Sequence, residues 1–383
     1  MLLAIAVISL HTGTDVFGMP GLSGFGFAAV NVFFVISGFY MAMILTEKYT
    51  SANPWVFYKS RLLRLFPAYF IGVLLGLIVT GSQLHATFHS LSLPGKIYMI
   101  VQNTLMIPQD LSSIICVRSN DGSCATMESL SANPPSWSLA VELGFYAIAP
   151  FVVRSARRTV AYFFAGVVYM VSLRLIDFPI NSVDFLQQMT DSRPISYSVY
   201  PASFLFFAAG ALGYQLSRGR VVPVYVLAFG GLFLLAFEPY WAVPFWQVPI
   251  FAAAVPTLFA LTKSNRFDRT IGELSYPVYV VHYPLNEWLG TLPLLKQPGF
   301  RLLTEGSWVA IASIATAVLI HYSLDRVVNR YRASARFLLA AELPPEVLPS
   351  ARAHRLLLLP KLAMIPYFAL PAVLVASILA TQA

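Results

Sequence analysis

The stretch PPSWSLAVELGFY, at Pro134–Tyr146, opens a long apolar segment that nevertheless carries a glutamate. The two prolines suit the first turn of a helix, where a missing N–H leaves no intrahelical bond unmade. Ser138, Glu142 and Tyr146 then recur every four residues and therefore share one face of that helix. A glutamate in a membrane-like segment is costly and usually faces a polar interior, so this face is predicted to mark a functional site.

The composition around this stretch is that of a membrane protein. Of the 383 residues, 57% are hydrophobic and 11% are charged, whereas a soluble domain carries about 25% charged residues. At about 20 residues per crossing, the chain is long enough for roughly ten transmembrane helices. The net charge of +8 is the excess of Lys and Arg that cytoplasmic loops of membrane proteins carry, so we expect no nucleic-acid partner.

Apolar segments of suitable length predict an all-α, polytopic bundle of about ten transmembrane helices. These segments lie near residues 1–13, 26–46, 66–82, 136–153, 159–176, 198–216, 221–237, 243–262, 272–292 and 306–325. A further apolar segment near 363–380 is a candidate for an eleventh, C-terminal helix. The segment 96–108 contains Gln102 and Asn103 and ends at Pro108, so we predict a short, re-entrant or interfacial segment there.

The positions of the basic residues test this arrangement. With the N-terminus in the cytoplasm, Lys and Arg gather in the predicted cytoplasmic loops and in the tail after residue 325. The exceptions among the 25 basic residues are Lys96, Arg118, Arg174, Arg193, Lys296 and Arg301. We therefore predict a multi-pass protein of the inner cell membrane. Its transmembrane domain would span 1–325, followed at 326–383 by a basic cytoplasmic tail that touches anionic membrane lipid and ends in the apolar helix.

The two cysteines, Cys116 and Cys124, lie in one polar loop on the predicted outer side. In an oxidising compartment they would form a disulfide that closes a short loop, and two free thiols are the alternative. Two cysteines without nearby histidines make a poor metal site. We accordingly predict no metal and no permanently bound cofactor.

Two pairs of polar residues near the predicted helix ends are candidates for catalysis and for ligand binding. His11 and Asp15 are four residues apart and would share a helical face, where a carboxylate can orient an imidazole that acts as general base. The alternative is an interfacial histidine bonded to a backbone carbonyl. Arg61 and Arg64 are three residues apart at the cytoplasmic mouth of the third helix, an arrangement suited to phosphate. The alternative is an anchor that reaches lipid headgroups.

Two further helices carry small or polar residues on an apolar background. Ser37-Gly38 interrupts the second predicted helix, which favours close helix packing over a polar channel lining. Ser275, Tyr279 and His282 fall on one stripe of the ninth. That stripe is either a wall that contacts substrate or a structural hydrogen-bond network.

Taken in order, these segments resemble the membrane-bound acyltransferase family three, which includes O-acetyltransferases of bacterial surface polysaccharides. The resemblance rests on His11, FFVISGF at Phe33–Phe39, RLLRLFPAY at Arg61–Tyr69, WSLAVE at Trp137–Glu142 with Phe145-Tyr146, and SYPVY at Ser275–Tyr279 with His282. One departure is an arginine that the family usually has eleven residues before the histidine. That position would fall before Met1, so we expect an incomplete first helix.

The resemblance implies acyl transfer from cytoplasmic acyl-CoA, expected to be acetyl-CoA, to a hydroxyl of a polysaccharide or another glycan, free or lipid-linked. It implies contact with CoA phosphates for Arg61 and Arg64, proton transfer for His11, and a catalytic role for Glu142. Glu142 and His11 would converge in the outer half of the bundle, opposite the arginine pair. The expected substrate-binding residues are Trp137, Ser138, Tyr146, Ser275, Tyr279 and His282.

Two other classes of function stay open at this point. A transporter or exporter of a polar solute or glycan would favour inverted repeats or paired broken helices, and the sequence displays neither. A non-catalytic membrane scaffold would not bind acyl-CoA.

Overall fold

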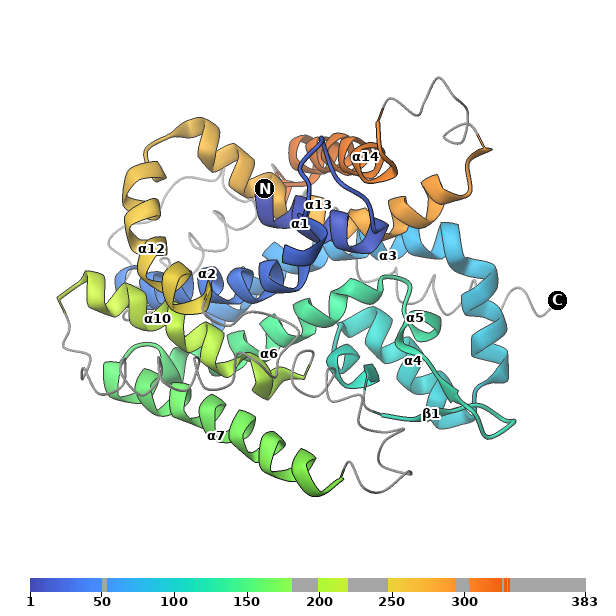
Figure 1. Ribbon diagram of the computed structural model, residues 1–383, viewed down its shortest axis with the longest axis horizontal. Coiled ribbons are helices and arrows are strands. Elements are labelled where there is room, and N and C mark those ends of the chain that lie inside the picture. The colour runs from blue at the N-terminus through green and yellow to red at the C-terminus, as the bar shows by residue number, and fades with distance from the viewer. Residues whose placement is uncertain are drawn as a thin grey trace, which may run out of the picture.

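The computed structural model describes residues 1–49, 54–113, 115–180, 199–219, 247–293, 303–325, 327–328 and 330. This part of the chain is all-α apart from one small hairpin, as predicted (Figure 1). The helices are α1 (Leu2–Thr12), α2 (Gly26–Glu47), α3 (Pro54–Ser90), α4 (Leu93–Leu105), α5 (Met127–Leu130), α6 (Trp137–Val152), α7 (Ala156–Ile180), α10 (Phe204–Ser217), α12 (Gln247–Thr262), α13 (Arg266–Gly290) and α14 (Glu305–Ile320). Strands β1 (Val117–Arg118) and β2 (Cys124–Ala125) pair antiparallel.

The predicted helices in the described ranges are present, with shifted ends. The largest difference is α3, predicted at 66–82 but 37 residues long. At 1.5 Å per residue it extends about 55 Å, well beyond the roughly 30 Å hydrocarbon core of a bilayer. Segment 96–108 is the short helix α4, held against β1 and α3. The predicted helices at 221–237 and 363–380 lie outside the described residues.

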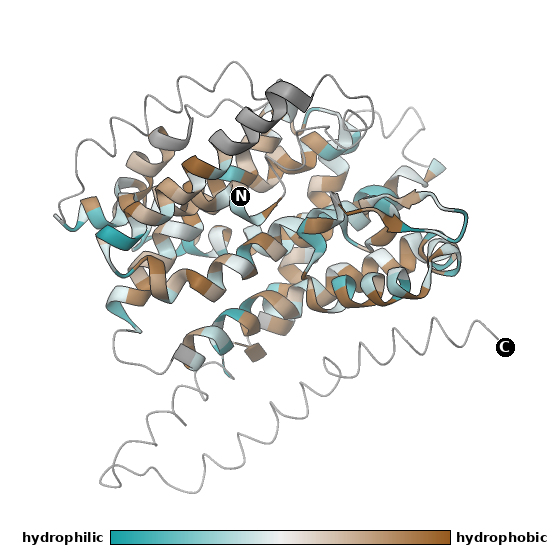
Figure 2. Ribbon diagram, turned by 90° about the horizontal axis from the view of Figure 1, so that it is seen from below, coloured by the Kyte–Doolittle hydropathy of each residue, from teal (hydrophilic) through white to brown (hydrophobic). Residues whose placement is uncertain are grey.

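Three helical segments of the described part are long and apolar enough to cross a membrane. They are Ser23–Glu47, Trp55–Ser90 and Glu305–Leu324. Hydrophobic residues, brown in Figure 2, run along most of the helices, and several large apolar side chains are exposed. Ile78, Val168 and Leu319 are 72%, 63% and 71% exposed, which a lipid environment tolerates and water does not favour. The chain is a membrane protein, and a total of ten crossings stays a prediction.

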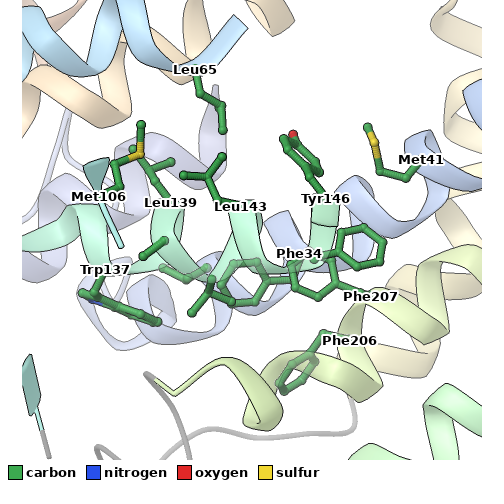
Figure 3. Close-up of a cluster of buried hydrophobic side chains, with 14 of the residues drawn as sticks. Phe34, Met41, Leu65, Met106, Trp137, Leu139, Leu143, Tyr146, Phe206 and Phe207 are labelled. Carbon is green, nitrogen blue, oxygen red and sulfur yellow. The ribbon is translucent and has the colours of Figure 1, made fainter. Parts of the chain in front are cut away.

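Helices α2 and α10 cross in direct backbone contact. A Cβ atom built on Gly38 would lie 2.0 Å from the Phe207 carbonyl oxygen, and one on Gly210 would lie 1.8 Å from the Val35 carbonyl oxygen. Each helix therefore needs a glycine where the other passes, which confirms the close packing predicted for Ser37-Gly38. The Phe145 and Phe207 rings stack at 4.0 Å beside this crossing and belong to one apolar core cluster, in which Figure 3 labels Phe207.

The hairpin closes the loop that leads to α6. Cys116 and Cys124 form a disulfide, so the alternative of two free thiols is wrong. At the hairpin turn, Asp121 Oδ1 accepts hydrogen bonds from Ser123 Oγ at 2.7 Å and from Ser123 N at 2.9 Å. These bonds hold the pKa of Asp121 below its usual value. A bridge between Leu91 and Ser119 ties the hairpin to the C-terminal end of α3.

Candidate functional site

Glu142 is held by side chains from two helices. Ser37 Oγ of α2 donates a 2.9 Å hydrogen bond to Glu142 Oε1. The Tyr146 hydroxyl, one turn further along α6, donates a short hydrogen bond to the same oxygen. The predicted common face of Glu142 and Tyr146 is therefore confirmed, and the carboxylate finds its partners inside the bundle, as an ionisable group in a membrane requires.

Arg61 lies beside this carboxylate cluster. Its side chain is buried, with the guanidinium 5.8 Å from the Phe57 ring and 6.0 Å from the Tyr146 ring. Such positions over aromatic faces stabilise a cation. In Figure 3 the Tyr146 hydroxyl points away from Phe34 and Phe207. The burial of Arg61 does not fit the alternative of a headgroup anchor, whereas Arg64 is exposed, and the role of Arg64 stays a prediction.

The expected separation between Glu142 and the arginine pair is also wrong. Glu142 bonds to Tyr146, and the Tyr146 ring contacts Arg61, so all three belong to one cluster. The reason is the packing of α3 against α6, which brings the N-terminal part of α3 alongside the middle of α6. The carboxylate therefore belongs with the arginines and not with the far end of the bundle.

Ser138 and Tyr279 tie the start of α6 to α13. Their hydroxyl oxygens lie 2.7 Å apart. The carbonyl oxygen of Pro135 lies 3.0 Å from Ser138 Oγ and 3.1 Å from the Tyr279 hydroxyl, so it accepts a hydrogen bond from this pair. Both side chains are buried. Two of the six predicted substrate-binding residues therefore meet at one point, where the Pro-Pro turn supplies the acceptor.

His282 is fully buried one turn beyond Tyr279 on α13. Its Nδ1 lies 2.5 Å from the Tyr279 carbonyl oxygen. A carbonyl oxygen only accepts, so Nδ1 carries the proton and the neutral ring keeps Nε2 as an unprotonated acceptor. Within the described residues, Nε2 has no hydrogen-bond partner.

His11 lies against this buried histidine. Its ring centre is 5.2 Å from that of His282 and 5.5 Å from that of Tyr283, which it meets edge-on. Unlike His282, His11 is exposed. The arrangement follows from the packing of α1 against α13, which lie next to each other in Figure 1. One histidine is thus exposed, while the other is enclosed in the bundle beside it.

Asp15 does not share the helical face of His11, so that prediction is wrong. Helix α1 ends at Thr12, and Gly13 follows in the left-handed conformation with φ 63°. Glycine adopts this conformation readily and commonly ends a helix. The chain then turns, and the Asp15 carbonyl oxygen accepts a hydrogen bond from Thr304 Oγ1.

His11 and Glu142 also do not converge directly, in contrast to our expectation. Within the described residues no hydrogen bond or ion pair joins them; instead, a line of polar side chains lies between. It runs from His11 to His282 and Tyr279 by ring contacts, and from Tyr279 to Ser138 by the hydroxyl pair. Ser138 is one turn from Glu142 on α6.

The remaining two predicted substrate-binding residues are engaged within the protein. Trp137 is buried in the apolar cluster of Figure 3. Ser275 Oγ donates to the Ile271 carbonyl oxygen at 2.9 Å and accepts from the Met1 nitrogen at 2.6 Å. Substrate contact by either residue stays a prediction. In the described part of the chain, no three His, Cys, Asp or Glu side chains are grouped as a metal ion would require.

A buried amide network, which the sequence analysis missed, holds the segment before α6. Gln102 and Asn103 both donate to the Leu130 carbonyl oxygen, at 2.7 and 2.8 Å. Asn103 Oδ1 accepts from the Ala132 nitrogen at 2.8 Å, and Gln109 Nε2 donates to the Asn133 carbonyl oxygen at 3.0 Å. The amides of Gln102 and Asn103 in an apolar segment were the signal, because buried amides need partners.

A family profile described as an acyltransferase domain matches residues 1–325 of the chain. The matched range includes every helix and strand named above. No curated protein and no solved structure matches the chain.

Proposed function

The chain belongs to acyltransferase family 3, and on that premise we propose that it transfers an acetyl group from acetyl-CoA to a hydroxyl of a cell-surface glycan. The observation that carries this proposal is the line of polar side chains from His11 to Ser138, which lies one turn along α6 from Glu142 of the Arg61 cluster. A proton acceptor at one end and a cationic cluster at the other suit a hydroxyl that attacks a CoA thioester.

We assign the proton transfer to His11. The acceptor oxygen attacks the thioester carbonyl carbon while its proton passes to the unprotonated ring nitrogen of His11. The C–S bond then breaks, and the CoA thiolate takes this proton from the His11 imidazolium, which restores the neutral base. A positioned general base of this kind contributes about 10²–10⁴-fold in rate. The exposure of His11 supports the assignment, because the acceptor hydroxyl must reach the imidazole.

The arginine pair suits the CoA end of the donor. Arg64 is exposed in the third turn of α3, where a guanidinium can bind phosphate oxygens in two parallel hydrogen bonds. Arg61 is buried and faces the cluster of Tyr146 and Glu142. We assign phosphate contact to Arg64 first, and to Arg61 the task of holding the positive charge beside Glu142. Glu142 in turn orients this end of the site through its bond from Tyr146.

We place the N-terminus and the arginine pair on the cytoplasmic side of the inner membrane. Arg61 and the bridge at Leu91 lie near opposite ends of α3, about 45 Å apart at 1.5 Å per residue. The disulfide hairpin is attached at the Leu91 end. Disulfides persist in oxidising compartments, which suits the outer side for the Leu91 end of α3. Acyl-CoA is a cytoplasmic donor, which suits the inner side for the Arg61 end.

The proposal is tested by mass spectrometry of surface glycans from cells with and without the gene. The proposal predicts glycan species heavier by one acetyl group when the wild-type chain is present, and their loss with His11→Ala. The exposed histidine His89, at the far end of α3, supplies the control variant His89→Ala, which should retain the acetylated species. Acetylated glycans at the same level with His11→Ala would overturn the assignment, and a transporter without acyl transfer would yield none with either chain.

A further inference from the structure

The unpaired nitrogen of His282 has no role in the chemistry described so far. A fully buried acceptor without a partner is destabilising, so such an atom in a functional region calls for an explanation. His282 Nε2 has no partner within the described residues, while Nδ1 is fixed by the Tyr279 carbonyl oxygen. The ring is therefore locked with an accepting nitrogen on its free edge.

His11 is a ring neighbour of His282 and carries hydrogen-bonding nitrogens. The two ring centres are 5.2 Å apart with the planes inclined by 44°. An edge-to-edge N–H···N bond of about 3 Å puts two imidazole centres roughly 5 Å apart. The observed separation of the ring centres is thus the one that a bonded pair requires, and a turn of the His11 ring toward His282 Nε2 is the movement that would make the bond.

We propose that His282 is a positioning residue that accepts a hydrogen bond from His11 through Nε2. This inference rests on the proposed function, in which His11 is the general base. The bond fixes which nitrogen of His11 carries the proton and leaves its other nitrogen unprotonated toward the acceptor hydroxyl. When His11 takes the acceptor's proton, His282 keeps the N–H of the resulting imidazolium bonded. No proton moves to His282, because its Nδ1–H stays on the Tyr279 carbonyl.

His282 thereby takes the place that sequence analysis gave to Asp15. A general base is commonly oriented by a second group on its far nitrogen, and a carboxylate is the usual choice. In this bundle the turn at Gly13 removes Asp15 from the face of His11. A neutral imidazole supplies the same accepting lone pair without placing a second negative charge in the apolar interior, where charges are costly.

Two substitutions separate this role from simple packing. His282→Asn keeps a donor near the position of Nδ1, so the bond to the Tyr279 carbonyl is retained while the acceptor toward His11 is lost. His282→Gln places a polar atom near the position of Nε2 and can accept from His11. The experiment measures acetyl transfer from labelled acetyl-CoA to the glycan acceptor in membranes that contain the full chain, with Tm of the purified protein measured alongside.

For His282→Asn we expect kcat to fall about 10–100-fold, with KM for acetyl-CoA and Tm unchanged, since general-base help is worth about 10²–10⁴-fold in all. For His282→Gln we expect kcat within about threefold of wild type, because the accepting atom is restored. Wild-type kcat with His282→Asn would overturn the inference. So would an equal loss in both variants that follows a lower Tm, because that pattern marks a structural role.

The same assay distinguishes failure of the inference from failure of the proposed function. If the wild-type chain transfers acetyl groups and His11→Ala does not, the proposed function stands whatever His282→Asn shows. If His11→Ala transfers at the wild-type rate, both the general-base assignment and the inference built on it are overturned.

Discussion

The Asn133 side chain donates from Nδ2 to the Val280 carbonyl oxygen at 2.9 Å. In an uninterrupted helix that carbonyl would accept from the N–H of the residue four positions later, but this residue is Pro284, which has none. Asn133 supplies the missing donor from the segment that precedes α6. The bond sets the position of α13 relative to α6, and with it the meeting of Tyr279 and Ser138.

The first prediction concerns this bond. Asn133→Ala leaves the buried Val280 carbonyl unpaired and should cost about 1–3 kcal/mol of stability, seen as a lower Tm of the purified protein. The control is the double variant Asn133→Ala with Pro284→Ala, in which the new backbone N–H at position 284 restores a donor. In the Pro284→Ala background, Asn133→Ala should lower Tm less than it does in the wild type. An equal drop in Tm in both backgrounds would refute the account of this bond.

The second prediction concerns Gly72, whose lack of a side chain leaves room for the hydrogen bond between Asn133 and Val280. A Cβ atom on Gly72 would lie 2.8 Å from Asn133 Nδ2 and 2.8 Å from the Val280 carbonyl oxygen. Gly72→Ala should therefore lower both Tm and acetyl transfer. Gly81, on the same helix, has nothing within 4 Å of such a Cβ atom. Gly81→Ala should leave Tm unchanged or raise it, because alanine favours helix by about 1 kcal/mol over glycine.

The third prediction separates the two arginines. Arg64→Ala should raise KM for acetyl-CoA about tenfold or more with little change in Tm, because Arg64 is exposed and is assigned to phosphate. Arg61→Ala should also lower Tm, because it removes a buried cation from the cluster of Tyr146 and Glu142. The exposed Arg266 of α13 is the matched control, and Arg266→Ala should change neither quantity. An unchanged KM with Arg64→Ala would contradict the phosphate assignment.

The fourth prediction tests the orientation in the membrane. After mild reduction of intact cells, a membrane-impermeant maleimide should label Cys116 and Cys124 from outside, because the hairpin is placed on the outer side. The variant with both cysteines changed to serine should take no label and should have a lower Tm, since loss of a native disulfide typically costs about 2–5 kcal/mol. Labelling that occurs only after the membrane is opened would reverse the orientation.

Local patterns in the sequence predicted well those features that depend on neighbours along one helix. The period of four placed Glu142 and Tyr146 on one face, and Ser37-Gly38 indicated a close helix crossing. The same logic failed for Asp15, because it assumed that α1 continues past Gly13. The sequence contains the signal for that helix end, because Gly13 follows the last helical residue.

Contacts between distant segments could not be predicted in the same way. The pairing of His11 with His282 depends on how α1 packs against α13, and no sequence spacing encodes that packing. The contact between Asn133 and Val280 could be predicted in part. Pro284 shows that a carbonyl on α13 needs an outside donor, but many polar residues in the chain were candidates. Catalytic roles within the site stay predictions, because geometry places side chains together without showing which of them react.

The central claim is that His11 is the base in acetyl transfer from acetyl-CoA. It is tested most directly with the purified full chain in liposomes, by following labelled acetyl groups from acetyl-CoA to the glycan acceptor. The account predicts turnover by the wild type and by His89→Ala, and at least a hundredfold loss with His11→Ala at unchanged Tm. Full turnover by a stably folded His11→Ala protein would contradict it.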